Sequence, residues 1–174
     1  MNSKSRLIII LFLSIFIFSS SSVKNKKKIP SSVQKYIERF KKVAQTEHRK
    51  FGIPASITIA QGILESRFGQ SLLTKKTNNH FGIKYYKGCG YKNSIMMADD
   101  KPNDRFIIYP NSWHSFRHHS EFLMTKRYKK CRQCGNDYKC WAINLKKCGY
   151  ATSKKYSRDL IKIIEDYQLY HLDR

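Results

Sequence analysis

The sequence lacks the short motifs that mark three large groups of enzymes. It contains no Gly-rich loop of the Walker type, no H-E-x-x-H and no G-x-S-x-G, and it shows no internal repeat. These absences remove the usual starting points for a nucleotide-dependent enzyme, a zinc protease or a serine hydrolase. With 174 residues, the chain has room for one domain of ordinary size.

Acidic residues are scarce. Twelve Asp and Glu stand against 34 Lys and Arg, which gives a formal net charge of +22, and the positive residues are spread along the chain. Such a field favours a polyanionic partner, and nucleic acid, an anionic membrane surface and the bacterial cell wall all qualify. Nucleotide bias in the source genome would produce the same excess of Lys. The charge therefore supports a polyanionic partner without choosing among the candidates.

A hydrophobic run long enough to cross a bilayer is also missing. The main apolar stretch, Leu7 to Phe18, follows two basic residues and precedes a run of serines. It is too short for a spanning helix, which needs about 20 residues, and its layout is that of a signal peptide without a clean A-x-A cleavage site. We predict a signal peptide over 1–22, a basic linker over 23–30 and one catalytic domain over 31–174. The protein is then exported to the periplasm, the cell envelope or the medium, and an uncleaved membrane anchor is the alternative.

Cysteine is absent from the first half of the chain. The five cysteines are Cys89, Cys131, Cys134, Cys140 and Cys148. In an exported protein they favour disulfides, and their odd number leaves at least one thiol free. The C-x-x-C formed by Cys131 and Cys134 is interpreted as a structural clasp, because a zinc site would need further ligands and the nearby histidines show no ligand spacing. Several pairings stay open, and we predict neither a metal nor a cofactor.

Hydrophobic spacing predicts a mostly helical domain. Apolar residues recur at helical spacing after Ser31 and Ser32, either of which can cap a first helix. A second, buried helix is expected from Pro54 until Gly69. Between residues 77 and 109 the composition changes to Asn, Gly and aromatic residues, which predicts loops and a small hairpin. Three further helical segments are expected over 112–128, 137–147 and 153–169.

Glu65 is the residue best placed to carry chemistry. It stands near the end of the second helix, where apolar residues occupy most of the circumference. An apolar surround disfavours the carboxylate, so we expect a raised pKa and a group able to donate a proton near neutral pH. Cleavage of a glycosidic bond needs such an acid on the leaving oxygen. A solvent-facing Glu at a helix end is the alternative.

Three segments decide between these interpretations of Glu65. They are I-A-Q-G-I-L-E-S-R-F-G-Q-S-L-L, N-N-H-F-G-I-K and W-A-I-N-L-K-K-C-G-Y-A-T-S-K-K-Y-S. In this order they resemble glycoside hydrolase family 73, the glucosaminidases of cell-wall autolysins and flagellar peptidoglycan hydrolases, over about Ser32 to Asp173. The resemblance implies an α+β, mostly α, lysozyme-like domain with a groove between a helical lobe and a small β-lobe. It also implies cleavage of the β-1,4 bond between N-acetylglucosamine and N-acetylmuramic acid in peptidoglycan.

The resemblance assigns roles to several residues. The glutamate of the A-Q-x-x-L-E-S motif is the general acid of the family, and Glu65 matches it. The second segment corresponds to N-N-L-F-G-I-K of the family, so Asn79, Phe81 and Gly82 are expected to contact substrate or shape the groove, with a core position as the alternative for Phe81. Tyr150, in G-Y-A-T, matches a tyrosine that positions the sugar or the reactive water. Further substrate contacts are predicted for Tyr85 and Tyr156, while Trp141 is expected in the helix core.

A second carboxylate is harder to identify. An inverting hydrolase places a general base roughly 6.5 to 9.5 Å from the acid. The family assigns this role to an acidic residue of the β-lobe, often a glutamate, whereas this chain has only Asp99, Asp100 and Asp104 there. Asp99 and Asp100 are the leading candidates. The alternatives are that they form a polar loop tip, and that the acetamido group of the substrate assists the reaction instead.

Two other functions compete with the hydrolase. A lytic transglycosylase also uses a lone glutamate, but expels the leaving group by internal attack of a muramic acid hydroxyl. A basic wall-binding module without activity would need only the charge. The three segments favour the hydrolase, acting as a monomer on peptidoglycan glycan strands. No nucleic-acid partner is expected. Contact with a membrane is expected only through an uncleaved N-terminal segment.

Overall fold

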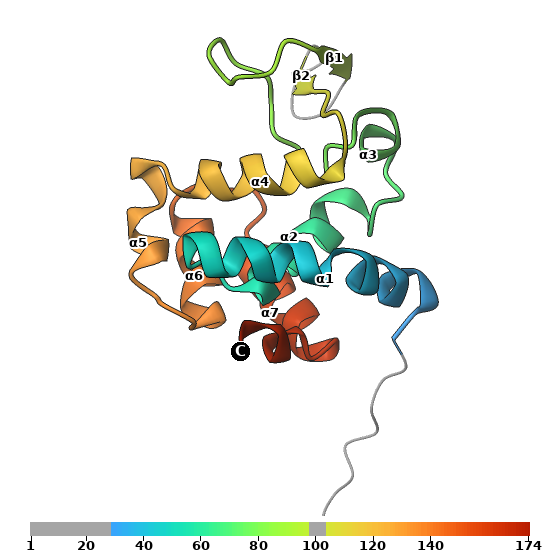
Figure 1. The fold of residues 1–174 in the computed structure, drawn as a ribbon. Helices are drawn as coiled ribbons and strands as arrows, with labels where there is room; N and C mark the ends of the chain where they lie inside the picture. The colour runs from blue at the N-terminus through green and yellow to red at the C-terminus, as the bar shows by residue number, and fades with distance from the viewer. Residues whose placement is uncertain (1–28, 98–103) are drawn as a thin grey trace, which may run out of the picture.

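The computed structural model describes residues 29–97 and 104–174. In chain order its elements are α1 (Ser31–Phe51), α2 (Ala55–Ser66), α3 (Leu72–Thr77), β1 (Ser94–Met97), β2 (Asp104–Ile107), α4 (Ser112–Leu123), the 3-10 helix η1 (Lys126–Tyr128), α5 (Lys129–Arg132), α6 (Tyr138–Lys147), α7 (Tyr156–Asp166) and the 3-10 helix η2 (Leu169–Asp173). The predicted α+β fold, mostly α with a small β-lobe, is confirmed. The hairpin lies at one end of the molecule beyond α4, and α1, α2, α6 and α7 form the helical body (Figure 1).

Helix α2 is the centre of the helical body. Every residue from Ala55 to Ile63 is buried, and the helix contacts α1, α6, α7 and η2. Gly62 has no side chain at the point where Tyr36 of α1 crosses, and a Cβ there would collide with the Tyr36 hydroxyl. At the other end, both carboxylate oxygens of Asp173 accept hydrogen bonds from the backbone N–H and hydroxyl of Ser56. The predicted buried helix is therefore confirmed, and the C-terminal residues hold its first turn.

Two predicted helix ends are wrong. Neither Ser31 nor Ser32 caps α1; Pro30 occupies the N-cap position, and its carbonyl accepts the first helical hydrogen bond, from Gln34. Helix α2 ends at Ser66 and not at Gly69, because Arg67 and the next residue adopt left-handed backbone angles. The Ser66 hydroxyl then accepts a hydrogen bond from the Gly69 N–H at 2.7 Å.

The later helices lie in the predicted places but span fewer residues than predicted. Helix α4 ends at Leu123, and η1 and α5 continue the chain. Asp137 caps α6 by accepting hydrogen bonds from the backbone N–H groups of the second and third residues of the helix. Helix α7 begins at Tyr156 and buries Tyr156, Leu160 and Ile164, which share one face at intervals of four. Trp141 is completely buried, as predicted.

The β-lobe is a two-stranded antiparallel hairpin. Ser94 pairs with Ile107 and Met97 with Asp104. The segment 81–86 runs beside β2, since the Tyr85 N–H donates to the Arg105 carbonyl at 2.7 Å, but it adds only an isolated bridge to the sheet. The predicted hairpin is confirmed, and α3 is a helix that the sequence did not indicate.

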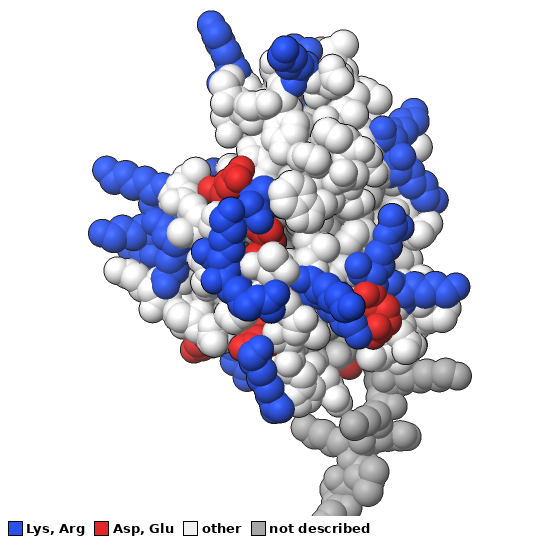
Figure 2. Space-filling model, viewed as in Figure 1, with Lys and Arg blue, Asp and Glu red and all other residues white. Residues whose placement is uncertain are grey.

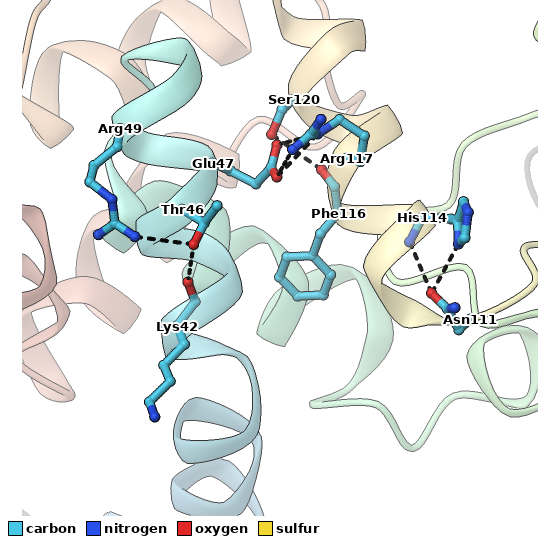
Figure 3. A network of polar contacts seen from close by, with 9 residues as sticks. All are labelled: Lys42, Thr46, Glu47, Arg49, Asn111, His114, Phe116, Arg117 and Ser120. Carbon is cyan, nitrogen blue, oxygen red and sulfur yellow. Dashed lines mark hydrogen bonds and ion pairs between the residues drawn. The ribbon is translucent and has the colours of Figure 1, made fainter.

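A buried ion pair joins α1 to α4. Glu47 is 0% exposed, and the Arg117 side chain, 17% exposed, donates to it from Nε at 2.9 Å and from Nη2 at 2.8 Å. The two side chains point toward each other between the helices (Figure 3). The guanidinium also lies over the rings of Phe51 and Trp113, 5.2 and 5.0 Å from their centres. This pair fixes how the helix that follows the β-lobe sits on the helical body.

The cysteines form one bond among the described residues. Cys134 is bonded to Cys140, and Cys89, Cys131 and Cys148 are free thiols. The expected disulfide is therefore present, and of the pairings that the sequence left open the structure has Cys134 bonded to the first turn of α6, with Cys131 as a free thiol. Within 29–97 and 104–174, no helix combines the length and the apolar character needed to cross a membrane.

Candidate active site

A groove opens at the end of α2 between the helical body and the β-lobe. Its volume is about 530 Å³, and it is lined by Glu65, Phe81, Gly82, Ile83, Lys84, Tyr86, Phe122, Arg127, Gly149, Tyr150, Ala151 and Thr152. One wall comes from the segment before the hairpin, and the other from the turn between α6 and α7. The three sequence segments singled out above therefore meet in one place, although they are far apart in the chain.

Glu65 supplies the carboxyl group of this groove. It is half-buried at the penultimate position of α2, and its side chain forms a hydrogen bond with the Tyr156 hydroxyl. Burial, and then the nearby negative charge of Glu65, raise the pKa of Tyr156 well above its usual range, so this hydroxyl stays protonated and donates. The surround of Glu65 thus includes a hydrogen-bond donor as well as apolar side chains.

Tyr156 is itself held by Gln61, one turn before Glu65 on α2. The Gln61 Nε2 donates to the Tyr156 hydroxyl at 2.8 Å, which leaves the tyrosine proton for Glu65. The Gln61 Oε1 lies 3.1 Å from His119 Nε2 and accepts a hydrogen bond from it. Burial lowers the pKa of His119 to about 3, so the ring is neutral and carries one proton. This contact requires the proton to be on Nε2. His119, Gln61 and Tyr156 therefore form a chain of buried donors that ends at Glu65.

Tyr150 has a different environment. Its hydroxyl is buried and has no hydrogen-bond partner among the residues that the structure describes, while the side chain lines the groove. Its ring stacks on that of Tyr156, with 5.7 Å between the centres. Burial, and then the neighbouring Tyr156 and Glu65, raise the pKa of Tyr150 well above its usual range. A neutral hydroxyl close to the acid can bond to a polar group of a bound molecule.

The wall that carries Tyr150 is fixed by two basic side chains. Arg127 donates to the carbonyl of Cys148 at 2.6 Å and also to that of Gly149. Gly149 has a φ of 73°, and a Cβ at this position would meet the Arg127 guanidinium. Lys146 donates to the carbonyl oxygens of the next two wall residues, Ala151 and Thr152, at 3.0 and 2.7 Å. The wall is therefore held through its backbone, so its side chains remain available.

The residues of the N-N-H-F-G-I-K segment hold the opposite wall. Asn79 is buried, donates to the carbonyls of Ile83 and Ile107, and accepts from two backbone N–H groups, so it shapes the groove from behind. Phe81 stacks on His119 with 3.9 Å between ring centres and also lines the groove. Gly82 lines the groove with a φ of 62°.

Of the remaining predicted residues, the structure describes Tyr85 but not the two candidate general bases. Tyr85 does not line the groove and has the Arg105 guanidinium over its ring at 5.0 Å, whereas its neighbour Tyr86 does line it. Asp99 and Asp100 lie outside the described residues. Asp104, the third aspartate of the segment, is nearly buried and forms an ion pair of 2.8 Å with Lys84, which lines the groove.

Sequence reasoning missed three side chains of the site: Gln61, His119 and Arg127. Gln61 stands four residues before Glu65, so its place on the same helix face was a usable signal. His119 and Arg127 belong to no motif, and only the fold brings them to the groove. Among the described residues, no group of three histidine, cysteine or acidic side chains could hold a metal ion.

Acidification is expected to destabilise this fold through its buried histidines. Burial, and then the charge of Arg39, lower the pKa of His80 to about 4 from an ordinary value of 6.5. Between these values the unfolded chain binds a proton that the folded chain does not, so stability falls as the pH falls, by up to about 3 kcal/mol for one such group. Urea unfolding at about pH 7 and about pH 5 should show roughly 2 kcal/mol of this loss, because the rest comes only below the folded pKa. The His80→Leu variant should lose less between these two conditions, and an equal loss in both proteins would contradict the assignment.

Basic residues cover the outside of the domain. Lys and Arg side chains are scattered across the visible face with a few acidic residues among them, and they do not gather in one patch (Figure 2). The distribution agrees with the spread of positive charge along the sequence. It gives a general attraction to polyanions without pointing to one binding surface.

Comparison with known proteins finds matches over most of the chain. Residues 41–169 match the model of the Glucosaminidase family, described as mannosyl-glycoprotein endo-beta-N-acetylglucosaminidase. The exo-glucosaminidase LytG of Bacillus subtilis is 34% identical over 155 residues, which cover 80% of this chain and 53% of that protein. The chain thus spans about half the length of this curated relative.

Solved structures share the fold. The catalytic domain of the autolysin Auto from Listeria monocytogenes is 28% identical with a TM-score of 0.70, and the match covers 84% of this chain and 90% of that domain. The glycoside hydrolase domain of FlgJ from Salmonella typhimurium, 24% identical, has a TM-score of 0.64 over 78% of this chain and 88% of that domain, a likeness of fold alone.

Proposed function

Because the chain belongs to the Glucosaminidase family, we propose that it is a peptidoglycan hydrolase that cleaves the β-1,4 bond between N-acetylglucosamine and N-acetylmuramic acid. The observation that carries the proposal is the position of Glu65, a half-buried carboxyl group that opens into a groove beside two neutral tyrosines. Glycan strands of peptidoglycan are the substrate, and their negative charge matches the basic surface. The chain acts outside the cytoplasmic membrane, as a monomer.

In the proposed reaction, Glu65 is the general acid. Its carboxyl group gives its proton to the oxygen that links the two sugars, and the bond from this oxygen to the N-acetylglucosamine anomeric carbon breaks. Once ionised, the carboxylate accepts the hydrogen bond of the Tyr156 hydroxyl, which stabilises the charge that forms as the proton leaves. Tyr156 is therefore a positioning residue, held ready by Gln61 and His119.

The water that completes the reaction needs a second group. Asp99 and Asp100 are our candidates for the general base, because they belong to the short segment that joins β1 to β2 at the β-lobe. The acetamido group of the substrate is the alternative source of this assistance. Tyr150 lies on the wall opposite the F-G-I-K segment, and its hydroxyl would hold either the sugar or the water. Asn79, Phe81, Gly82 and Tyr85 shape or support the other wall.

The chemical ends of the products test this function. Purified peptidoglycan is digested with the protein, reduced with borohydride and analysed by mass spectrometry. The proposal expects reduced N-acetylglucosamine at the new ends. Reduced muramic acid would assign the cut to the other glycosidic bond, and anhydro-muramic ends would identify a lytic transglycosylase; either product, or no product at all, contradicts the proposal.

Removal of the hydroxyl from Tyr150 and from Tyr156 should have different effects on stability. Tyr150→Phe deletes a buried hydroxyl without a partner among the described residues, so stability should be unchanged or slightly higher while wall digestion falls. Tyr156→Phe leaves the Gln61 amide without its acceptor and should cost about 1–3 kcal/mol. Thermal unfolding and the rate of wall digestion measure both quantities. Full activity of Tyr150→Phe would remove this hydroxyl from the mechanism.

A further inference from the structure

Two of the free thiols meet beside the groove. Cys131 is completely buried in α5, and Cys148, half-buried directly after α6, packs against the same hydrophobic core. The Cys148 thiol lies close enough to that of Cys131 to raise its pKa, and Arg127, four residues before Cys131, donates to the Cys148 carbonyl at 2.6 Å. The ring of Tyr128 lies near both thiols and 6.1 Å from that of Tyr150. The pair therefore lies directly behind the wall that carries Tyr150.

We infer that Cys131 and Cys148 form a second disulfide when the protein is oxidised. The bond would join α5 to the residue after α6, whereas Cys134–Cys140 joins the turn after α5 to the first turn of α6. Cys134–Cys140 holds the first turn of α6, and the new bond would hold the residue that follows its last turn. With both bonds formed, Cys89 would be the one thiol left, as an odd number of cysteines requires.

The order of the chemical steps follows from burial. Burial, and then the neighbouring Cys148, raise the pKa of the Cys131 thiol to about 12, so it is a poor nucleophile on its own. The more accessible Cys148 thiolate attacks a small-molecule disulfide such as glutathione disulfide and releases one thiol. Cys131 then loses its proton and attacks the mixed disulfide at the Cys148 sulfur, which releases the second thiol. Two electrons and two protons pass from the cysteines to the oxidant.

The second disulfide would restrain one wall of the groove. Cys148 is followed by Gly149, Tyr150, Ala151 and Thr152, all of which line the groove. Arg127 and Lys146 hold this segment through backbone carbonyls, and a covalent bond at Cys148 would fix its first residue as well. The pairing itself does not depend on the proposed function, whereas any gain in wall digestion would rest on it.

Tryptic peptides test the pairing directly, because each of the four cysteines falls in a different peptide: 131–132, 133–139, 140–146 and 148–154. The full chain is incubated with glutathione disulfide, alkylated, digested without reduction and analysed by mass spectrometry. We expect peptide 131–132 linked to 148–154 beside 133–139 linked to 140–146. Alkylated thiols at both Cys131 and Cys148, or a link from either to another cysteine, would overturn the inference.

Variants separate the bond from its effect. Oxidation should raise the Tm of the wild type and of Cys89→Ser, and should slow deuterium exchange over 149–152 in both. It should do neither in Cys148→Ser, where the bond cannot form. Cys131→Ala removes the other sulfur of the bond and should give the same result as Cys148→Ser. A rise in Tm in Cys148→Ser as large as in the wild type would contradict the inference, and none of these measurements uses wall digestion.

Discussion

Substitution of Glu65 by Gln is expected to lower the rate of peptidoglycan digestion by a factor of about 10² to 10⁴, the range that a positioned general acid contributes. The amide has nearly the shape of the carboxyl group, and it can still accept the hydrogen bond of Tyr156. It has no acidic proton to give to the leaving sugar oxygen. The Tm and the circular dichroism spectrum should therefore stay close to those of the wild type while release of soluble wall fragments is lost.

Glu38→Gln is the matched control for this variant. Glu38 lies on α1 with 58% of its side chain exposed, and its ion pair with Lys41 is within one turn of the helix. Exposed pairs of this kind contribute little, so both activity and stability should be unchanged. Digestion by Glu65→Gln at the rate of the control would remove Glu65 from the chemistry and leave the groove without an acid.

Arg117→Met is expected to lower stability by about 3–5 kcal/mol, the usual cost of leaving one charge of a buried pair without its partner. Glu47 is 0% exposed, and Arg117 donates to both of its carboxylate oxygens. The methionine retains much of the apolar contact with Phe51 but none of the donors. Because domains of this size are stable by about 5–15 kcal/mol, a large part of the folding free energy would be lost. Urea unfolding measures the difference.

Two further variants show whether the effect comes from the stranded charge. In Glu47→Leu combined with Arg117→Met no charge remains, so much of the lost stability should return. Lys162→Met removes an exposed ion pair with Asp166 on α7 and should cost at most about 1 kcal/mol. If Arg117→Met were no more harmful than Lys162→Met, the pair would not be what holds α4 on α1.

Much of the fold could be predicted because the helices carry their signal locally. The spacing of apolar residues in α1, α2 and α7 matches the helix period, and the change of composition after Thr77 indicates the β-lobe. The helix ends were less predictable. The start of α1 depends on Pro30, and the end of α2 depends on the left-handed backbone of Arg67. Neither boundary therefore lies where the apolar pattern alone places it.

The site could be predicted only where a motif contains it. Glu65 and Tyr150 stand in segments that resemble a family, and the structure brings both to one groove. The support for Glu65 depends on pairs that are distant in the chain: Gln61 meets His119 and Tyr156 only after α2, α4 and α7 have packed. The same is true of Glu47 with Arg117, which are 70 residues apart, because spacing along the chain says little about which side chains meet in the fold.

The most direct test of the central claim is a crystal structure of the Glu65→Gln variant with a bound oligomer of alternating N-acetylglucosamine and N-acetylmuramic acid. The claim predicts that the oxygen joining the two sugars lies within hydrogen-bonding distance, about 2.6–3.2 Å, of the side chain at position 65. One of the sugars should contact Tyr150. An oligomer bound instead in the hollow beside Lys35, Arg39 and Lys75, with the groove at position 65 unoccupied, would contradict the account.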